Sequence, residues 1–144
     1  MNTRLIPAIL MSLFIRQSLA QGKIVVNITN IKNDKGVCRT CLFNNSSAFN
    51  GETGQPVRCL SIAVKNKTAQ ANFENIPAGK YAVMVFHDAN SNNKIDRNFL
   101  GIPKEGYGAS KNKLPFASAP TFDDNMFILK DRTTSNISIN LRNL

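Results

Sequence analysis

The chain has 144 residues, a formal net charge of +9, nine Phe, no Trp and a single His. About 120 residues beyond a leader suffice for one domain with one hydrophobic core and are too few for two ordinary domains. Its Lys and Arg residues are scattered singly, without an aromatic-interleaved basic patch or zinc-finger spacing, which argues against nucleic-acid binding. We interpret the charge mainly as a source of solubility, with loose attraction to anionic envelope polymers as the weaker alternative.

Residues 1–20 have the pattern of a cleaved secretory leader. Arg4 precedes an apolar run from Leu5 to Ile15, and the small residues Ser18 and Ala20 occupy the positions that a signal peptidase reads. The run is short against the ~20 residues needed to cross a bilayer. A retained N-terminal anchor is therefore the less favoured alternative.

We predict cleavage between Ala20 and Gln21, which leaves a single β-sandwich domain over residues 21–144. Cleavage removes two Arg and no acid, so the formal charge falls from +9 to +7. The product should be secreted or periplasmic, monomeric and without a stable membrane span. Its partner is expected to be an envelope or extracellular ligand whose identity the sequence does not reveal.

Three cysteines in an exported chain predict one disulfide and one free thiol. Cys38 and Cys41 are an odd number of positions apart, so on one extended strand they point to opposite faces and cannot easily bridge each other. Cys59 is then the shared candidate partner. We favour Cys41–Cys59, and Cys38–Cys59 stays open. A zinc site is disfavoured because the chain has one His and no second CxxC pair.

Beyond the leader, apolar residues recur at period two in short blocks separated by turn formers, which predicts β-strands. The first two predicted strands, 24–28 and 37–43, flank a turn at 33–36, and we expect them to pair as a hairpin. Further strands are predicted at 57–64, 68–76, 81–86, 126–129 and 137–141. Seven short strands at this rhythm favour an all-β fold, a Greek-key β-sandwich with one long irregular excursion.

The predicted strand 81–86 is apolar on both faces, and such a strand is usually central and covered twice. The opposite sheet should cover one face. We expect the excursion 88–120 to cover the other, because connections of that length without secondary structure are mostly functional or held by a ligand.

The start of this excursion has the spacing of a cation-binding loop. Oxygen-bearing groups fall on the series one, three, five, seven and nine of a calcium loop, the seventh through its backbone carbonyl: Asp88, Asn90, Asn92, Lys94 and Asp96. Asn93 stands where that loop has Gly, and Phe99 where a bidentate Glu closes it. Glu105 can supply the missing carboxylate if the excursion folds back. Calcium is the one candidate cofactor, and the alternative is that these side chains only cap backbone amides in tight turns.

His87 is the only histidine and ends the buried strand. As an enzyme, the protein would use His87 as a general base with Ser110 or Tyr107 as nucleophile or acid. The favoured interpretation is structural: His87, Tyr107 and Ser110 anchor the loop or line a binding face, and Tyr107 packs as a covering ring. We therefore predict no catalytic residue.

Two long segments carry a family resemblance, HDxNxNxKxD from His87 to Asp96 and GIPxEGYGxS from Gly101 to Ser110. Gly36, the run Ile76–Val83 and Pro120-x-Phe122 extend it over nearly the whole mature chain. In these residues the sequence resembles a bacterial family of exported proteins known as domain of unknown function 2141. Asn93 and Ala109 depart from the family pattern, which has Gly and an aromatic residue there. The resemblance implies no activity.

The Pro-Ala-Gly-Lys-Tyr turn is also similar to transthyretin-like and carboxypeptidase-regulatory-like sandwiches, which implies a prealbumin-like architecture by analogy. We predict an exported, non-enzymatic binding or accessory module of the cell envelope, with the segment 88–110 as its functional face. The alternatives are an envelope hydrolase that uses His87 with nearby carboxylates, and a purely structural adhesion-type module.

Overall fold

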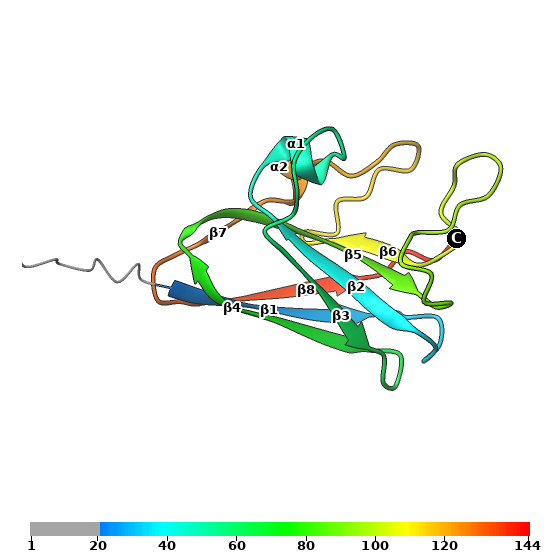
Figure 1. The fold of residues 1–144 in the computed structure, drawn as a ribbon, viewed down its shortest axis with the longest axis horizontal. Coiled ribbons are helices and arrows are strands. Elements are labelled where there is room, and N and C mark those ends of the chain that lie inside the picture. The colour runs from blue at the N-terminus through cyan, green and yellow to red at the C-terminus, as the bar shows by residue number, and fades with distance from the viewer. Residues whose placement is uncertain (1–20) are drawn as a thin grey trace, which may run out of the picture.

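Two β-sheets form the framework of the protein in a computed structural model that describes residues 21–144 (Figure 1). One sheet has the strand order β4-β1-β8, and the other has the order β3-β2-β5-β6 with β7 paired to β5. The elements are β1 (Gln21–Thr29), β2 (Val37–Phe43), α1 (Ser46–Phe49), β3 (Arg58–Ala63), β4 (Ala69–Pro77), β5 (Gly79–Asp88), β6 (Tyr107–Ala109), α2 (Phe122–Asn125), β7 (Phe127–Leu129) and β8 (Thr134–Asn140). The predicted all-β class is confirmed, and the predicted leader lies outside the described residues.

The core lies between the two sheets and follows the alternation predicted from the sequence. Ile24, Val26 and Ile28 of β1 are fully buried, because alternate side chains of a strand point to the same face. β1 pairs antiparallel with β4 and parallel with β8, so it is the central strand of its sheet. The first core cluster joins these residues to inward-facing side chains of β2, β4, β5 and β8.

The predicted hairpin between the first two strands is wrong, because β1 and β2 lie in different sheets. β2 pairs with β3 and β5 instead. The segment between β1 and β2 crosses from one sheet to the other, and its Asp34 carboxylate accepts backbone amide hydrogens from Asn66 and Lys67 in the β3–β4 turn. Turn-forming residues predicted the change of direction, but they do not specify which strand becomes the neighbour.

The structure has eight strands among the described residues, where seven were expected. The additional strand, β6, lies inside the predicted irregular excursion and pairs with Met84–Phe86 of β5. It is only three residues long and contains Gly108, so no period-two pattern marks it. The Greek-key connectivity and the prealbumin-like architecture stay predictions.

β5 is buried on both faces, as predicted. Tyr81, Val83 and Val85 belong to the first core cluster, whereas Ala82 belongs to a second cluster against which Met84 packs. The predicted cover by the excursion 88–120 is seen only in part: its Ala109 belongs to this second cluster, and its Leu114 packs against it.

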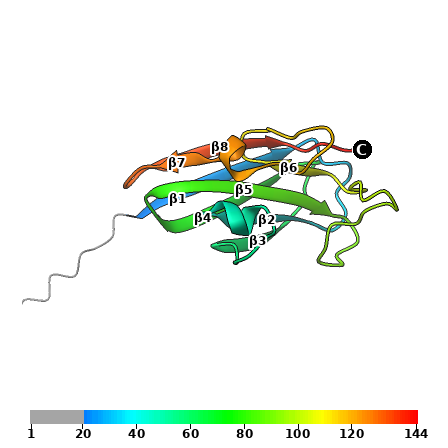
Figure 2. The same ribbon diagram turned by 90° about the horizontal axis from the view of Figure 1, so that it is seen from above.

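The two short helices supply much of that cover; they lie together at the top of Figure 1, and Figure 2 views the molecule from that side. Phe49 of α1 packs edge-to-face against Phe43 and Phe122, with ring centroids 5.3 and 6.0 Å away. Large aromatic rings cover a sheet face efficiently because each buries a large area. The first part of the excursion, directly after Asp88, is therefore not needed as cover and extends beyond the end of β5.

The disulfide joins Cys41 and Cys59, as favoured from the sequence. The two residues are direct partners on neighbouring antiparallel strands, with their Cα atoms 4.1 Å apart. Cys38 is free and faces the core, where burial raises the pKa of its thiol to about 12. A thiol with that pKa is almost entirely protonated at neutral pH and therefore unreactive.

Replacing Cys59 with Ser should lower the free energy of unfolding by about 3 kcal/mol, because the bridge closes a loop between residues 18 positions apart. Denaturant titration of both proteins measures this difference. The difference should vanish when reductant is added to the wild type.

Thiol labelling provides the control. Folded wild-type protein should not react, and the unfolded, unreduced protein should show one thiol, whereas Cys38→Ala should show none. Three reactive thiols in the oxidised wild type, or equal stability of wild type and Cys59→Ser without reductant, would contradict the bridge.

Candidate functional site

The candidate site lies where β5 ends and the chain leaves the sheets. His87 and Asp88 are the last residues of β5 and are opposite Cys38 and Val37 of β2. The segment 89–106 then runs outward and returns to β6, and it is the loop at the right of Figure 1. We call this segment the β5–β6 loop.

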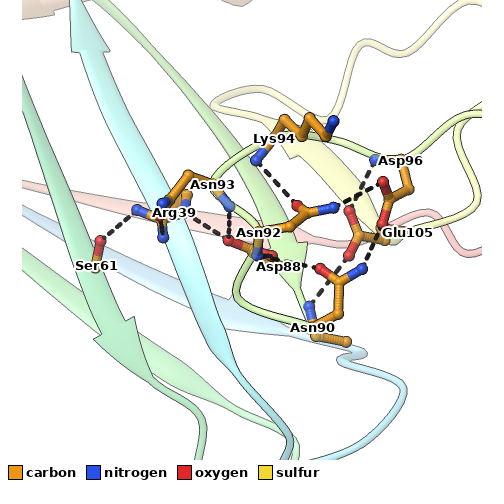
Figure 3. A network of polar contacts seen from close by, with 10 residues as sticks. Arg39, Ser61, Asp88, Asn90, Asn92, Asn93, Lys94, Asp96 and Glu105 are labelled. Atoms are coloured by element: carbon orange, nitrogen blue, oxygen red, sulfur yellow. Dashed lines mark hydrogen bonds and ion pairs between the residues drawn. The ribbon is translucent and has the colours of Figure 1, made fainter.

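Asp88 is the centre of a polar network at the base of the loop (Figure 3). Its side chain is fully buried, and one carboxylate oxygen accepts hydrogen bonds from Nε of Arg39 at 2.7 Å and from the Asn93 amide at 2.9 Å. The other oxygen accepts from the Asn92 amide at 3.0 Å. Burial alone raises the pKa of Asp88, but these hydrogen bonds and the Arg39 charge outweigh it, so the pKa lies below its ordinary value.

Arg39 connects three parts of the molecule and was not predicted from the sequence. From β2 its guanidinium reaches Asp88, donates to Oγ of Ser61 on β3 at 3.0 Å, and donates to the side-chain oxygen of Asn93 in the loop. A signal was present, because Arg39 is the one charged residue in the seven-residue strand β2. A positively charged side chain in a strand with neighbouring strands on both edges loses water, and this cost is offset only when an acidic side chain pairs with it.

A second layer of the network surrounds Asp96. Its two carboxylate oxygens accept hydrogen bonds from the side-chain amides of Asn90 at 2.7 Å and Asn92 at 2.9 Å. The side-chain oxygens of Asn90 and Asn92 in turn accept the backbone amides two residues on, at Asn92 and Lys94. These are Asx turns. The Lys94 side chain is exposed.

Glu105 folds back onto the start of the loop. One of its carboxylate oxygens accepts the amide hydrogen of Ala89 at 3.2 Å, and the other accepts that of Asp96 at 3.0 Å. Glu105 therefore ties the two sides of the loop together. The structure brings the predicted residues into one network. Asp88, Asn90, Asn92 and Glu105 accept loop backbone amides, that of Lys94 among them, and Asp96 accepts the two Asn carboxamides.

Whether these side chains can coordinate a cation depends on the orientation of the Asn90 and Asn92 carboxamides. Both present their NH₂ groups to Asp96, and a half-turn of each carboxamide would present its oxygen instead. Asp88 would have to share oxygens that already accept from Arg39 and two backbone amides. Within residues 21–144, no group of three or more His, Cys, Asp or Glu side chains is arranged to hold a metal ion.

His87 and Ser110 anchor the two ends of the loop segment. His87 is 2% exposed, and its Nε2 donates to the backbone carbonyl of Lys35 at 2.7 Å. Ser110 is 5% exposed, and its hydroxyl accepts from the Val83 amide and donates to the Asn125 carbonyl at 2.7 Å. The two side chains therefore bind separate backbone groups.

Tyr107 begins β6, opposite Phe86, and is half-buried. Its backbone amide and carbonyl exchange hydrogen bonds with Arg142 near the C-terminus. The sequence analysis also missed Asn125, which is fully buried and accepts the backbone amides of Lys111 and Lys113. A buried carboxamide that satisfies a loop backbone is hard to distinguish in sequence from a surface Asn.

The outer part of the loop is a narrow finger with an apolar tip. Asp96 and Lys104 are joined by a backbone hydrogen bond of 2.8 Å, and Arg97 and Pro103 form a β-bridge. Beyond them three apolar side chains face solvent, with exposed fractions of 95% for Phe99, 68% for Leu100 and 41% for Ile102. We call these three residues the apolar tip. From the sequence, Phe99 is predicted only as a departure from the calcium-loop pattern, and its exposure is a finding of the structure.

Replacing Asp88 with Asn should destabilise the protein by about 3 kcal/mol at pH 7, because it leaves the Arg39 charge without its partner. The pKa of Asp88 is lower in the folded state than in the unfolded state, so its contribution is present above pH ~4 and is lost as pH falls through the folded-state pKa. The difference between wild type and Asp88→Asn should therefore shrink below pH ~4.

Thermal melts between pH 7 and pH ~2.5 measure this difference. Asp131→Asn, at an exposed turn, is the matched control and should change little at any pH. An Asp88→Asn difference that stays constant over the whole range would contradict the ionised pair.

The comparisons with known proteins place this loop within a recognised family. The family model described as "Uncharacterized protein conserved in bacteria (DUF2141)" matches residues 26–137, which run from β1 into β8 and include the whole β5–β6 loop. A search of the curated proteins finds no match. The matched region covers well over half of the chain. This protein therefore belongs to the DUF2141 family of uncharacterized bacterial proteins.

Proposed function

We propose that this protein is an exported, non-enzymatic binding or accessory module of the cell envelope, and that the segment 88–110 is its binding face. One observation carries the proposal: an apolar tip is held in solvent on a loop whose base is fastened by partly buried hydrogen bonds. Exposed apolar groups of this kind mark interaction sites on proteins. Binding residues are commonly carried by loops on a rigid scaffold.

The fastening of the loop favours binding. A flexible loop loses conformational entropy when it is ordered on a partner, which weakens affinity. Here Asp88 and Glu105 satisfy four backbone amides of the loop before any partner arrives. The loop is thus already ordered in the free protein.

The surroundings of His87 give little support to the hydrolase alternative. A general base must come within hydrogen-bond reach of the proton it removes. His87 is buried and its Nε2 is bonded to a backbone carbonyl, while Ser110 is buried and bonded at its hydroxyl on both sides. The nearest carboxylate along the chain, Asp88, is paired with Arg39.

Export is supported by the covalent chemistry of the chain. The Cys41–Cys59 disulfide is typical of proteins in oxidising compartments. The leader pattern of residues 1–20 agrees with this. The helices in the described part of the chain are all too short or too polar to cross a membrane.

Binding to envelopes tests this proposal. The processed chain should sediment with bacterial envelope fractions, and Phe99→Ser combined with Leu100→Ser should reduce the bound fraction by about tenfold, because two exposed apolar anchors are lost. Ile128→Ser is the matched control, because Ile128 is also exposed but lies on β7, which pairs with the opposite end of β5.

His87→Gln separates binding from catalysis. It should lower stability by about 1 kcal/mol through the changed hydrogen bond and leave envelope binding intact. An envelope-hydrolysing activity that disappears in the folded His87→Gln variant would contradict the proposal that this protein is a non-enzymatic binding module. Equal envelope binding by the wild type and the tip variant would instead favour the adhesion-type structural alternative.

Calcium is the cation we propose for the 88–96 loop, with stabilisation as its only role. A ligand that binds the native state alone adds about 2.7 kcal/mol at a hundredfold excess over its Kd. The melting temperature should therefore rise by several degrees in millimolar calcium relative to EDTA. Asp96→Asn should abolish the rise, whereas Asp34→Asn, in the β1–β2 connection, should preserve it.

Identical melting curves of the wild type in calcium and in EDTA would contradict the proposal that this loop binds calcium. Turn capping would then be the whole role of these side chains.

A further inference from the structure

Most backbone amides of the segment that carries the apolar tip are hydrogen-bonded within that segment. The side-chain oxygen of Asn98 accepts the amide hydrogens of Leu100 at 2.9 Å and Ile102 at 3.0 Å. The Asn98 amide donates to the Ile102 carbonyl, and the Gly101 amide donates to the Asn98 carbonyl, both at 2.9 Å. Four of the five backbone amides of the segment 98–102 are thus hydrogen-bonded within the segment itself.

This matters because a backbone amide that leaves water without a partner costs several kcal/mol. An ordinary loop cannot enter an apolar medium for that reason. The segment 98–102 carries its own partners for these amides, and its Phe99 and Leu100 side chains already point into solvent.

The charges around the tip are positive. From Arg97 to Lys104 the finger has two cations and no acid, and both side chains are exposed. The three acids of the loop segment accept hydrogen bonds within the protein: Asp88 binds Arg39, Asp96 binds the side-chain amides of Asn90 and Asn92, and Glu105 binds two backbone amides. After leader removal the whole chain carries +7, which reinforces attraction to an anionic surface.

Apolar side chains framed by Lys and Arg are the chemistry of interfacial membrane binding. Phe and Leu bury in the boundary between headgroups and acyl chains, while cations remain near the lipid phosphates. The finger presents both, with the apolar side chains at its end and the cations on either side of them.

We propose that the apolar tip docks this protein onto the surface of an anionic phospholipid bilayer, with Phe99 and Leu100 at the headgroup boundary and Arg97 and Lys104 beside the phosphates. This inference rests on the proposed function, because export brings the chain to a membrane leaflet. A lipid surface fits better than a protein groove. A protein partner would be recognised partly through backbone groups, and those of the tip are largely used internally.

The absence of Trp from the chain permits a direct test. The processed Phe99→Trp variant should show a blue shift of its fluorescence on addition of phosphatidylglycerol-containing vesicles, and quenchers placed in the upper acyl chain should reduce the emission. Ile128→Trp, which places the same reporter on an exposed site of β7, should not shift.

Sedimentation with the same vesicles gives the affinity. Phe99→Ser combined with Leu100→Ser should weaken binding at least about tenfold while the melting temperature is unchanged. Vesicles of phosphatidylcholine alone should bind at least about tenfold more weakly, and added salt should weaken binding to the anionic vesicles.

Four results would overturn the inference. If envelopes bind the protein but anionic vesicles do not, the partner is not lipid, and the proposed function still holds. If Phe99→Trp and Ile128→Trp respond alike, the tip is not the docking site. If the tip variant changes the oligomeric state without lipid, a second copy of the chain covers the tip. Failure to bind either envelopes or vesicles would contradict the proposed function as well.

Discussion

The ion pair between the buried Asp88 carboxylate and the partly buried Arg39 guanidinium is the interaction on which the β5–β6 loop depends. Asp88 ends β5, and Arg39 comes from the neighbouring strand β2, so the pair is formed across the sheet. The same carboxylate holds the amides of Asn92 and Asn93. A buried carboxylate is tolerated only when its acceptors are filled, which means that the charge of Asp88 imposes the path of the loop.

The fold makes this arrangement possible because the loop that follows β5 is not required as cover for the sheet. Because α1 and α2 cover much of the second face of the sheet, the β5–β6 loop is not needed to bury Ala82 or Met84. Ser110 fastens the returning chain to Val83 and Asn125. The loop is thus fixed at both ends and can hold Phe99 in water. In an unsupported loop, the hydrophobic effect would favour packing of this side chain onto the sheet.

Sequence periodicity predicted the parts of this fold that depend on local alternation, such as the two buried faces of β5 and the exclusion of a Cys38–Cys41 bridge. It left open which of these two cysteines pairs with Cys59, and the structure shows Cys41. It failed where the choice is between partners: β1 pairs with β4 and β8 and not with β2, because turn residues do not encode sheet membership. The oxygen-rich spacing after His87 drew attention to the right loop. Arg39 and the exposure of Phe99 were missed because both depend on contacts between segments distant in sequence.

The central claim is that the Asp88–Arg39 pair keeps the loop ordered. Amide hydrogen exchange of Arg39→Met, compared with the wild type, tests it most directly, since methionine retains much of the side-chain length without the charge. The account predicts that the amides of Asn92 and Asn93 lose protection while those of β1, in the other sheet, keep theirs. Unchanged protection at Asn92 and Asn93 in a folded Arg39→Met variant would contradict it.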